Sequence, residues 1–322
     1  MRRDTFLKSL AALAATGALP AAWAQAGANL KVLIPANPGG GWDTTGRALG
    51  KAMQDAKQAA TVTYENKGGA SGALALAPFL SSAKGDAGQI MVMGAVMLGG
   101  LISSKSPLNL MQATPLARLT TEYNVFVLPA NSPFKSMADV VAQLKKDPGS
   151  VKWGGGSRGA TEHIAAAMIA REAGVDPAKI NYVAFRGGGE ATAAILGGNV
   201  TVGGSGLSEF APYIASGKMK PIAVTSAQRQ ASAKDVPTLK EQGINVEIGN
   251  WRGVFGAPGI TPEQRKALID AIEATTRSPG WQEALKKNDW TSALLTGDAF
   301  AQFVDSEFAS LRAIMVKSGM VS

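Results

Sequence analysis

Apolar runs, glycine clusters and helix-type spacing alternate along this chain. Residues 31–35 (Lys-Val-Leu-Ile-Pro) form a β-branched, apolar run that predicts a short buried strand. Pro38 and the glycines at 39–41 predict a turn, because they favour neither a helix nor a strand. From Trp42 onward, apolar residues recur at the spacing of one helix face. The pattern therefore predicts a strand, a glycine-rich turn and a helix in succession.

Three more stretches repeat this pattern. Glycine lets the backbone come close to a ligand, and the first N–H groups of a helix carry partial positive charge without a side chain. One such junction is consistent with an ordinary connection in an α/β sheet, whereas four favour several helix N-termini meeting at one small anion. The repeats lie at residues 64–73, 151–163 and 180–190, and they run into predicted helices at 74–80, 164–171 and 191–196.

The rest of the pattern predicts an α/β protein with two lobes. Ser136 and Thr261 are the expected N-caps of two helices, because each precedes a helical pattern with an acidic first turn. The extended stretches at 123–128 and 249–255 are interpreted as two crossings between lobes. This division places residues 27–126 and 250–322 in one lobe and residues 127–249 in the other. Further strands are expected at 89–96, followed by a glycine-rich bend, and at 200–203 and 221–225.

The first 26 residues have the pattern of an export signal. They combine a basic start that includes Arg2 and Arg3, an apolar centre at 10–19, and small residues that suit cleavage after Ala24 or Ala26. The start resembles a twin-arginine signal with one extra residue, so both general and folded-state export stay open. A membrane anchor is disfavoured, because the apolar run is shorter than about 18 residues. The segment therefore predicts an exported protein.

The charge pattern differs from that of a nucleic-acid-binding protein. The chain has 32 lysines and arginines against 24 aspartates and glutamates, a formal charge of +8. Without the first 26 residues, which hold three basic residues and one acidic residue, the charge is +6 over 296 residues. The excess is spread along the chain without basic–aromatic interleaving, so no nucleic-acid partner is expected. A chain of this length is long enough for two lobes with their own cores.

Reactive side chains are sparse. The chain has no cysteine and one histidine, His163, so it lacks ligands for a zinc or redox centre, and no cofactor or metal is expected. Residues 155–159 match the G-x-S-x-G elbow of hydrolases, but that architecture needs a histidine late in the chain. The turn at 39–46 matches neither a P-loop nor a dinucleotide fingerprint. A secreted α/β hydrolase or transferase that uses Ser157 is kept as the alternative function.

Five glycine-containing motifs together carry a family resemblance. In chain order they are 38–47 (Pro-Gly-Gly-Gly-Trp-Asp-Thr-Thr-Gly-Arg), 66–72 (Asn-Lys-Gly-Gly-Ala-Ser-Gly), 156–163 (Gly-Ser-Arg-Gly-Ala-Thr-Glu-His), 185–189 with 196–199, and 251–258. The ordered set resembles the extracytoplasmic solute receptors of tripartite tricarboxylate transporters, the Bug receptors, over essentially the whole chain after the signal. The resemblance implies a periplasmic binding protein of type II, the two-lobed Venus-flytrap fold, with membrane permease subunits as partners. A monomer that binds its ligand without catalysis is expected.

The resemblance also implies how a ligand is held. In that family the turns corresponding to 38–43 and 157–163 hold carboxylates through backbone N–H groups, hydroxyls and waters. Most members have threonine at the position of Trp42. The Gly-Gly-Gly-Trp-Asp form resembles the branch that includes citrate receptors, so a di- or tricarboxylate is expected, with citrate favoured.

Several side chains keep two interpretations. Asp43 either caps its helix or reaches a ligand hydroxyl, and Trp42 either walls the cleft or plugs the lobe interior. His163 is more readily a packed residue than a ligand contact. Arg158 and Arg186 either pair with the anion or are solvated loop residues. The full expected ligand-binding set is Pro38, Gly39, Gly40, Gly41, Trp42, Asp43, Gly69, Ala70, Ser71, Ser157, Arg158, Gly159, Thr161, His163, Arg186, Gly187 and Ser205.

Overall fold

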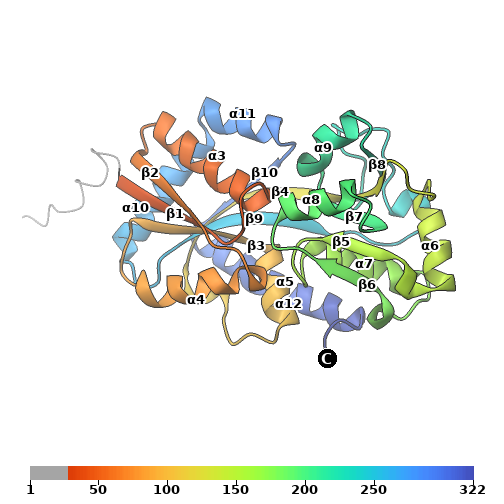
Figure 1. Cartoon of the computed structure of the whole chain (residues 1–322). Helices are drawn as coiled ribbons and strands as arrows, with labels where there is room; N and C mark the ends of the chain where they lie inside the picture. The colour runs from red at the N-terminus through yellow and green to blue at the C-terminus, as the bar shows by residue number, and fades with distance from the viewer. Residues whose placement is uncertain (1–27) are drawn as a thin grey trace, which may run out of the picture.

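The structure, a computed structural model, describes residues 28–322. The predicted signal peptide at 1–26 lies outside the described residues. The described chain is a mixed α/β protein on one curled sheet, with strands in the order β2-β1-β3-β9-β4-β7-β5-β6 and with β10 and β8 also paired to β4. Figure 1 shows the strands gathered into two lobes joined through β4 and β9. The predicted two-lobed α/β fold is confirmed.

The first lobe contains the strands on one side of β4. Here β1 pairs in parallel with β2 and β3, while β9 runs antiparallel to β3 and to the first half of β4. Helices α3 and α11 cover one face of this sheet, and α4, α5 and α12 lie on the other (Figure 1). The elements are β1 Ala28–Ile34, α3 Gly41–Asp55, β2 Ala59–Asn66, α4 Ala73–Ser82, β3 Gln89–Gly94, α5 Ala95–Ser103, β9 Gly249–Gly256, α10 Pro262–Thr276, α11 Pro279–Lys287, β10 Thr291–Thr296 and α12 Gly297–Lys317.

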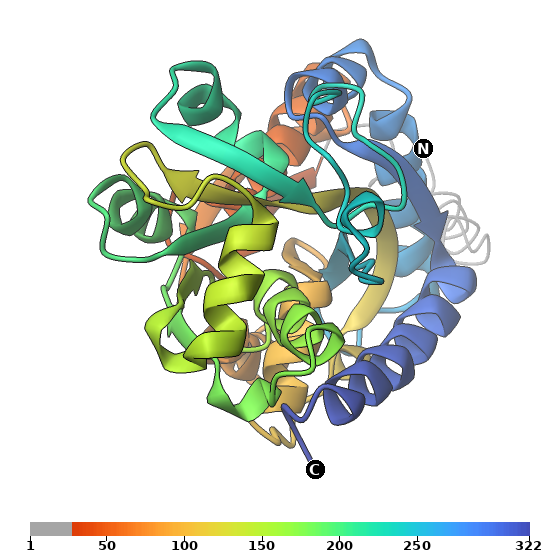
Figure 2. The same ribbon diagram turned by 90° about the vertical axis from the view of Figure 1, so that its right-hand side faces the viewer.

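The second lobe contains the strands on the other side of β4. Strand β5 pairs in parallel with β6 and β7, whereas β7 and β8 run antiparallel to the second half of β4. Seen from this lobe, α6 and α7 lie in front of the strands (Figure 2). The elements are β4 Thr114–Pro129, which both lobes share, α6 Met137–Lys146, β5 Lys152–Gly155, α7 Thr161–Glu172, β6 Asn181–Ala184, α8 Gly188–Leu196, β7 Val202–Gly206, α9 Leu207–Ala215 and β8 Met219–Val224.

The chain changes pairing partners abruptly where it passes between the lobes. Tyr123 of β4 pairs with Gly249 of β9, and the next residue, Asn124, pairs with Gly206 of β7. On the return, the Ile248 N–H donates to the Thr225 carbonyl before β9 begins. We propose that the hinge lies at these two switches. The lobe boundaries given above stay a prediction.

Helix starts follow the sequence signals where a side chain supplies the cap. The Ser136 hydroxyl accepts the Asp139 N–H at 3.2 Å, and the Thr261 hydroxyl accepts the Gln264 N–H at 3.2 Å. Both N-caps are therefore confirmed. By contrast, α3 begins after Gly40, which has no side chain that could cap the helix.

The glycine-rich bend expected after residue 96 is wrong, because these residues form α5. Its glycines are needed for packing rather than for a turn. A Cβ atom on Gly99 would overlap with the carbonyl oxygen of Gly159 in the other lobe, and one on Gly100 would overlap with the Ser71 side chain. The apolar residues around them are buried, and this tertiary packing overrides the weak helix propensity of glycine. Helix α5 thus brings the two lobes into backbone contact.

Two apolar clusters support the lobes. The larger runs through both lobes and includes the edge-on ring pair Phe126–Trp153, whose centroids lie 5.4 Å apart. The smaller lies in the second lobe around Phe210, with Val125 and Val127 from the opposite face of β4. In the part of the chain that the structure describes, no helix is both long and apolar enough to cross a membrane.

The contact between Gly99 and Gly159 predicts that even a methyl side chain in place of Gly99 will hold the lobes apart. Gly99→Ala should enlarge the radius of gyration of the ligand-bound protein in small-angle X-ray scattering, because in the closed form the methyl group would overlap with backbone that cannot move aside. Gly149→Ala is the matched control, since its Cβ would meet only Asp147 Oδ1 at 3.6 Å. Equal radii for both variants and the parent, with unchanged circular dichroism, would contradict this account of the closed lobes.

Candidate ligand-binding site

One cavity of about 80 Å³ lies between the lobes and is lined by residues of both. The first lobe contributes the start of α3 and part of β9. The second lobe contributes the loops before α7 and α8 and the start of α9. A wider groove of about 370 Å³ adjoins the cavity and shares Gly69, Ser157, Phe185 and Arg186 with it. The glycine turns predicted to face one another do line one space.

The start of α3 presents free backbone donors to this cavity. The first intrahelical hydrogen bond runs from the Thr44 N–H to the Gly40 carbonyl at 3.0 Å. The N–H groups of Gly41, Trp42 and Asp43 precede it and so have no partner within the helix. Gly40, Gly41 and Trp42 line the cavity, and Gly39 makes the turn with a φ of 90°. This end of α3 can receive an anion through its backbone alone.

Two helix starts of the second lobe face the same space. Helix α7 follows Ala160 and α8 follows Gly187, and neither start is capped by a side chain. Ala160 and Gly187 line the cavity together with Gly188. Three uncapped helix N-termini from two lobes therefore surround one small volume.

The lobes are in contact around this volume. The Asn37 amide donates to Glu190 Oε1 at 3.0 Å, and the Ser71 hydroxyl donates to the Arg158 carbonyl at 3.0 Å. A Cβ atom on Gly40 would lie 3.1 Å from the Gly188 nitrogen. The described structure is therefore the closed form of the cleft.

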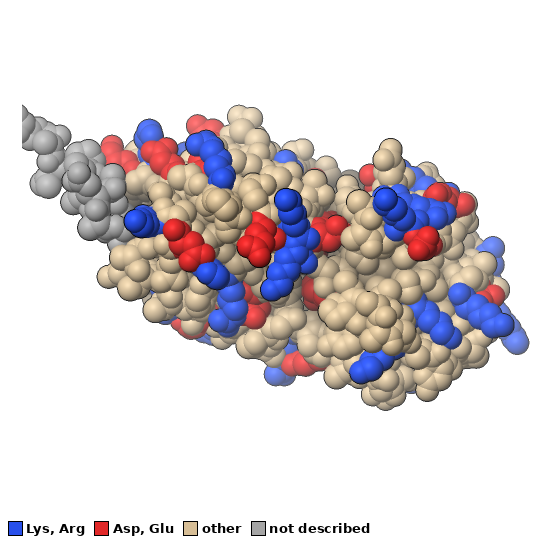
Figure 3. All heavy atoms as spheres, turned by 90° about the horizontal axis from the view of Figure 1, so that it is seen from above, with Lys and Arg blue, Asp and Glu red and all other residues tan. Residues whose placement is uncertain are grey.

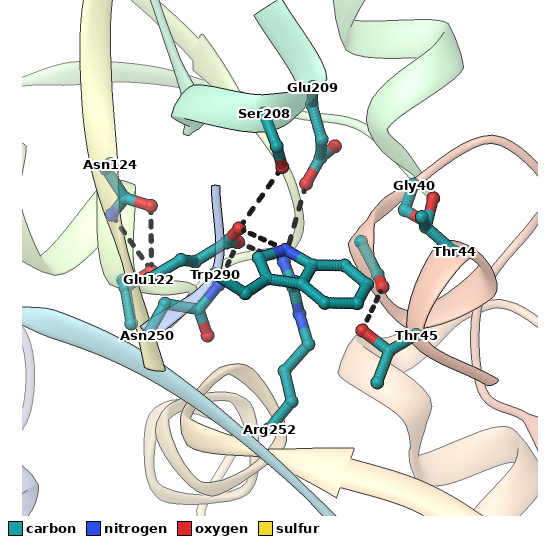
Figure 4. Close-up of polar contacts among 12 residues, drawn as sticks. Gly40, Thr44, Thr45, Glu122, Asn124, Ser208, Glu209, Asn250, Arg252 and Trp290 are labelled. Carbon is teal, nitrogen blue, oxygen red and sulfur yellow. Dashed lines mark hydrogen bonds and ion pairs between the residues drawn. The ribbon is translucent and has the colours of Figure 1, made fainter. Parts of the chain in front are cut away.

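A buried ion pair forms the floor of the cavity, where β4 and β9 meet. Glu122 of β4 pairs with Arg252 of β9, and each side chain is only 3% exposed. Glu122 also accepts hydrogen bonds from Trp290 Nε1 at 3.1 Å, Asn250 Nδ2 at 3.3 Å and the Ser208 hydroxyl at 3.3 Å. Figure 4 shows these donors arranged around the Glu122 carboxylate. The Glu122 carboxylate is thus surrounded by donors from both lobes.

Two further glutamates make the cavity rich in carboxylates. Glu209 of α9 lies 3.6 Å from Arg252 Nη2, and a Cβ atom on Gly41 would lie 2.8 Å from Glu209 Oε1. Burial, and next the neighbouring Glu122 carboxylate, raise the pKa of Glu209 to about 7 against the opposing effect of Arg252. Burial also raises the pKa of Glu162, although the Gly156 N–H donates to its carboxylate at 2.6 Å. The buried Arg252 therefore lies beside two carboxyl groups, those of Glu122 and Glu209, and a third carboxyl group, that of Glu162, lines the same cavity.

Asp43 and Trp42 both support the first turn. Asp43 is buried and accepts the Gly39 N–H at 3.1 Å, Arg47 Nε at 2.8 Å and Asn66 Nδ2 at 2.9 Å. These bonds fix the turn in place. Trp42 lines the cavity and also packs in the larger apolar cluster, so both of its interpretations describe part of its environment.

His163 and Thr161 lie behind the turn that precedes α7. His163 Nδ1 accepts the Gly159 N–H at 3.0 Å, and the ring stacks on Tyr182 with centroids 4.0 Å apart. Burial, and secondarily the charge of Arg158, lower the pKa of His163 to about 4. Thr161 exchanges hydrogen bonds with the Asn124 amide, which donates to its hydroxyl at 2.9 Å. Both residues are buried and brace the loop.

The predicted binding residues fall into three groups, and their contact with ligand stays a prediction. Those lining the central cavity are Gly40, Gly41, Trp42, Gly69, Ser157, Arg186, Gly187 and Ser205. Those lining only the adjoining groove are Ala70, Ser71 and Arg158. Those that line neither are Pro38, Gly39, Asp43, Gly159, Thr161 and His163.

Sequence reasoning missed the polar floor of the cavity. Asn124, Glu162, Glu209, Asn250 and Arg252 line it and were not expected there. A signal was present, because Asn124 and Asn250 are polar residues inside the extended, largely apolar stretches that were interpreted as the two crossings between lobes. Glu162 and Arg252 also lie inside motifs already noted. Glu209 had no local signal, since only the folded chain brings α9 to the cavity.

Charges of both signs are mixed on the surface. On the face seen from above, lysine and arginine side chains alternate with aspartate and glutamate (Figure 3). Across residues 28–322, no group of three or more histidine, aspartate or glutamate side chains is arranged to hold a metal ion.

Curated relatives match most of this chain at low identity. The protein BugT of Bordetella pertussis is 26% identical over 304 residues, which cover 90% of this chain and 89% of BugT. A protein in the gbd 5′ region of Cupriavidus necator is 29% identical over 194 residues, 60% of this chain. That second alignment spans 58% of the Cupriavidus protein.

Solved structures share the fold. The periplasmic binding protein BugD superposes with a TM-score of 0.80 at 23% identity, covering 91% of this chain and 98% of BugD. MatC from Rhodopseudomonas palustris with bound malate gives a TM-score of 0.78 at 22% identity, covering 89% and 98% of the two chains. A second R. palustris protein, solved with adipate, gives 0.80 at 20% identity, covering 90% and 97%.

A family model identifies the chain itself. The model of the tripartite tricarboxylate transporter family receptor, TctC, matches residues 47–320. Such receptors are periplasmic, bind small carboxylates and work with membrane transporter subunits. They are not enzymes, so the hydrolase or transferase alternative is set aside. With its uncapped helix starts around one interlobe cavity, the chain belongs to the tripartite tricarboxylate transporter receptor family.

Proposed function

We propose that this receptor binds a small carboxylate in the interlobe cavity and delivers it to the membrane subunits of a tripartite tricarboxylate transporter. The observation that carries the proposal is the convergence of three uncapped helix starts, α3, α7 and α8, on one cavity. Backbone N–H groups at such ends bind carboxylates without a dedicated side chain. The neighbours solved with malate and adipate support a carboxylate ligand.

The finer features of the ligand are also proposals. Citrate is favoured by the Gly-Gly-Gly-Trp-Asp form of the first turn, whereas the carboxyl groups of Glu162 and Glu209 in the cavity lining work against a third ligand carboxylate at that end. We keep a dicarboxylate or tricarboxylate as the class and citrate as one member to be tested.

Export and assembly complete the proposal. Residues 1–26 are proposed to direct export, with cleavage after Ala24 or Ala26, by either the general or the twin-arginine route. The receptor is proposed to act as a monomer whose two lobes close on the ligand through the two crossings at β4 and β9.

The first prediction concerns ligand class. A di- or tricarboxylate should raise the melting temperature of the exported protein, because a ligand that binds only the folded state stabilises it by mass action. The measurement is a thermal-shift screen of citrate, malate, adipate, amino acids, sugars and nucleotides. A shift with a sugar or nucleotide, and none with any carboxylic acid, would refute the proposal.

The second prediction concerns how the anion is held. Arg186→Ala and Arg158→Ala should each weaken binding by roughly ten- to hundredfold at most, the contribution of one charge-assisted hydrogen bond. Gly40→Val should weaken it more, because a side chain there would press on the Gly188 nitrogen across the cleft and cover the helix start.

Calorimetric titration of the best ligand from the screen ranks these variants. Gly149→Val, at an exposed position far from the cavity, is the control for adding the same side chain. Complete loss of binding in a folded arginine variant, beside near-normal binding in Gly40→Val, would show that side-chain charge rather than backbone holds the anion.

A further inference from the structure

The floor of the cavity holds polar atoms whose hydrogen-bonding needs the protein leaves unmet. Among the described residues, Asn250 Oδ1 and Arg252 Nη1 are buried and have no hydrogen-bond partner within the protein. Asn250 is 6% exposed and Arg252 is 3% exposed, and both line the cavity. Buried polar atoms normally have partners, so these two point to a bound molecule.

The orientation of the two groups tells which chemistry they need. The Asn250 amide nitrogen donates to Glu122, so its oxygen is the atom left to accept a hydrogen bond. Arg252 uses Nη2 for Glu122, so Nη1 is the atom left to donate. The floor therefore leaves one acceptor and one donor for a ligand to satisfy, on two residues of β9 that point to the same face of the strand because they are two positions apart.

Glu209 lies between the floor and the helix starts. Its side chain is 13% exposed, and a Cβ atom on Gly188 or Gly41 would press against its carboxyl group. The charged groups facing it are Glu122 from β4, Glu162 from α7 and Arg252 from β9, while the Ser205 hydroxyl bonds to it from β7. Arg186, on the exposed loop before α8, lines the same cavity.

The balance of charge decides between an anion and a cation at this point. Arg252 is already paired with Glu122, so it offers Glu209 little compensation at 3.6 Å. A second ligand carboxylate placed against Glu209 would add repulsion in a buried space. A ligand ammonium would instead neutralise Glu209 and supply the donor that Asn250 Oδ1 lacks.

We infer that Glu209, with Asn250 and Arg252, makes the cavity select a ligand that carries an ammonium group next to a carboxylate, as an α-amino acid does. The ammonium contacts Glu209 and Asn250 Oδ1, and the neighbouring carboxylate accepts from Arg252 Nη1 and the start of α3. The pKa of Glu209, raised to about 7, fits this role. In the ligand-free protein a bound proton partly neutralises the Glu209 carboxylate, and in the complex the ligand ammonium neutralises it instead. The inference rests on the proposed function.

Matched ligand pairs test it without any variant. Each pair shares one carbon skeleton and differs only in the amino group: succinate and L-aspartate, glutarate and L-glutamate, adipate and L-2-aminoadipate. In whichever pair binds, calorimetry at about pH 8 should show the amino member at least tenfold tighter, the effect expected of a charge-assisted hydrogen bond. Equal or tighter binding of the plain diacid would overturn the inference.

The binding affinities for the amino members and for the plain diacids should also change in opposite directions as the pH rises from about 6.5 to about 8.5. An ammonium favours ionised Glu209, so binding of the amino member releases a proton and strengthens as pH rises through 7. A plain diacid favours protonated Glu209, so its binding takes up a proton and weakens over the same interval. Parallel pH profiles for the two members would contradict the role of Glu209.

The variant Glu209→Gln tests whether Glu209 causes the preference for the amino ligands. This nearly isosteric change should weaken binding of the amino member at least tenfold and leave the diacid equal or tighter, so that the preference collapses. Glu283→Gln, the same change at an exposed position on α11, should leave both affinities unchanged. If Glu209→Gln has a normal melting transition and its ratio of affinities for the amino member and the diacid equals that of the parent protein, Glu209 is not the source of the selectivity.

The outcomes separate this inference from the proposed function. If no acid of either type binds, the carboxylate function itself is wrong. If diacids bind with no preference for the amino members, the function stands and the inference is wrong.

Discussion

The ion pair of Glu122 and Arg252 is the interaction on which the rest of the cleft depends. It joins strands β4 and β9 near the point where β4 changes its pairing partner from β9 to β7, and it is almost fully buried. Removing one partner of such a pair typically costs about 3–5 kcal/mol, because the other charge is left uncompensated. Ser208 from one lobe and Trp290 from the other also donate to Glu122 (Figure 4). The proposed hinge therefore contains a buried charged centre.

Fixing this centre has an electrostatic consequence for the cavity above it. Because Arg252 is held by Glu122, its charge cannot be given wholly to Glu209 or to a ligand. The free backbone donors of α3, α7 and α8 then supply most of the positive potential that an anion meets. Glycines at the contacts keep these helix ends near enough to act together, as the close approach of Gly40 and Gly188 shows.

Local sequence patterns predicted the elements that carry the turns, and failed where only packing decides. Ser136 and Thr261 were readable as caps because their chemistry is local. Helix α5 was missed because Gly99 and Gly100 are explained by atoms of Gly159 and Ser71, distant in sequence. Glu209 was missed for the same reason, since nothing beside it in the chain marks α9 as part of the cavity. The glycine-rich turns before the helices recur as a motif along the sequence. The polar residues of the floor instead come one or two at a time from four separate elements, β4, α7, α9 and β9.

The contacts that hold the lobes together are weak enough for a ligand to control them. The bonds Asn37–Glu190 and Ser71–Arg158 lie at exposed or half-buried positions, where a hydrogen bond contributes about 1 kcal/mol. The glycine contacts add little apolar burial, because glycine has no side chain to bury. A ligand that touches α3 on one lobe and α7 or α8 on the other gains all its second-lobe contacts only on closure. That differential affinity is what shifts an open–closed equilibrium, so we propose that closure in this receptor is set by the ligand rather than by the lobes.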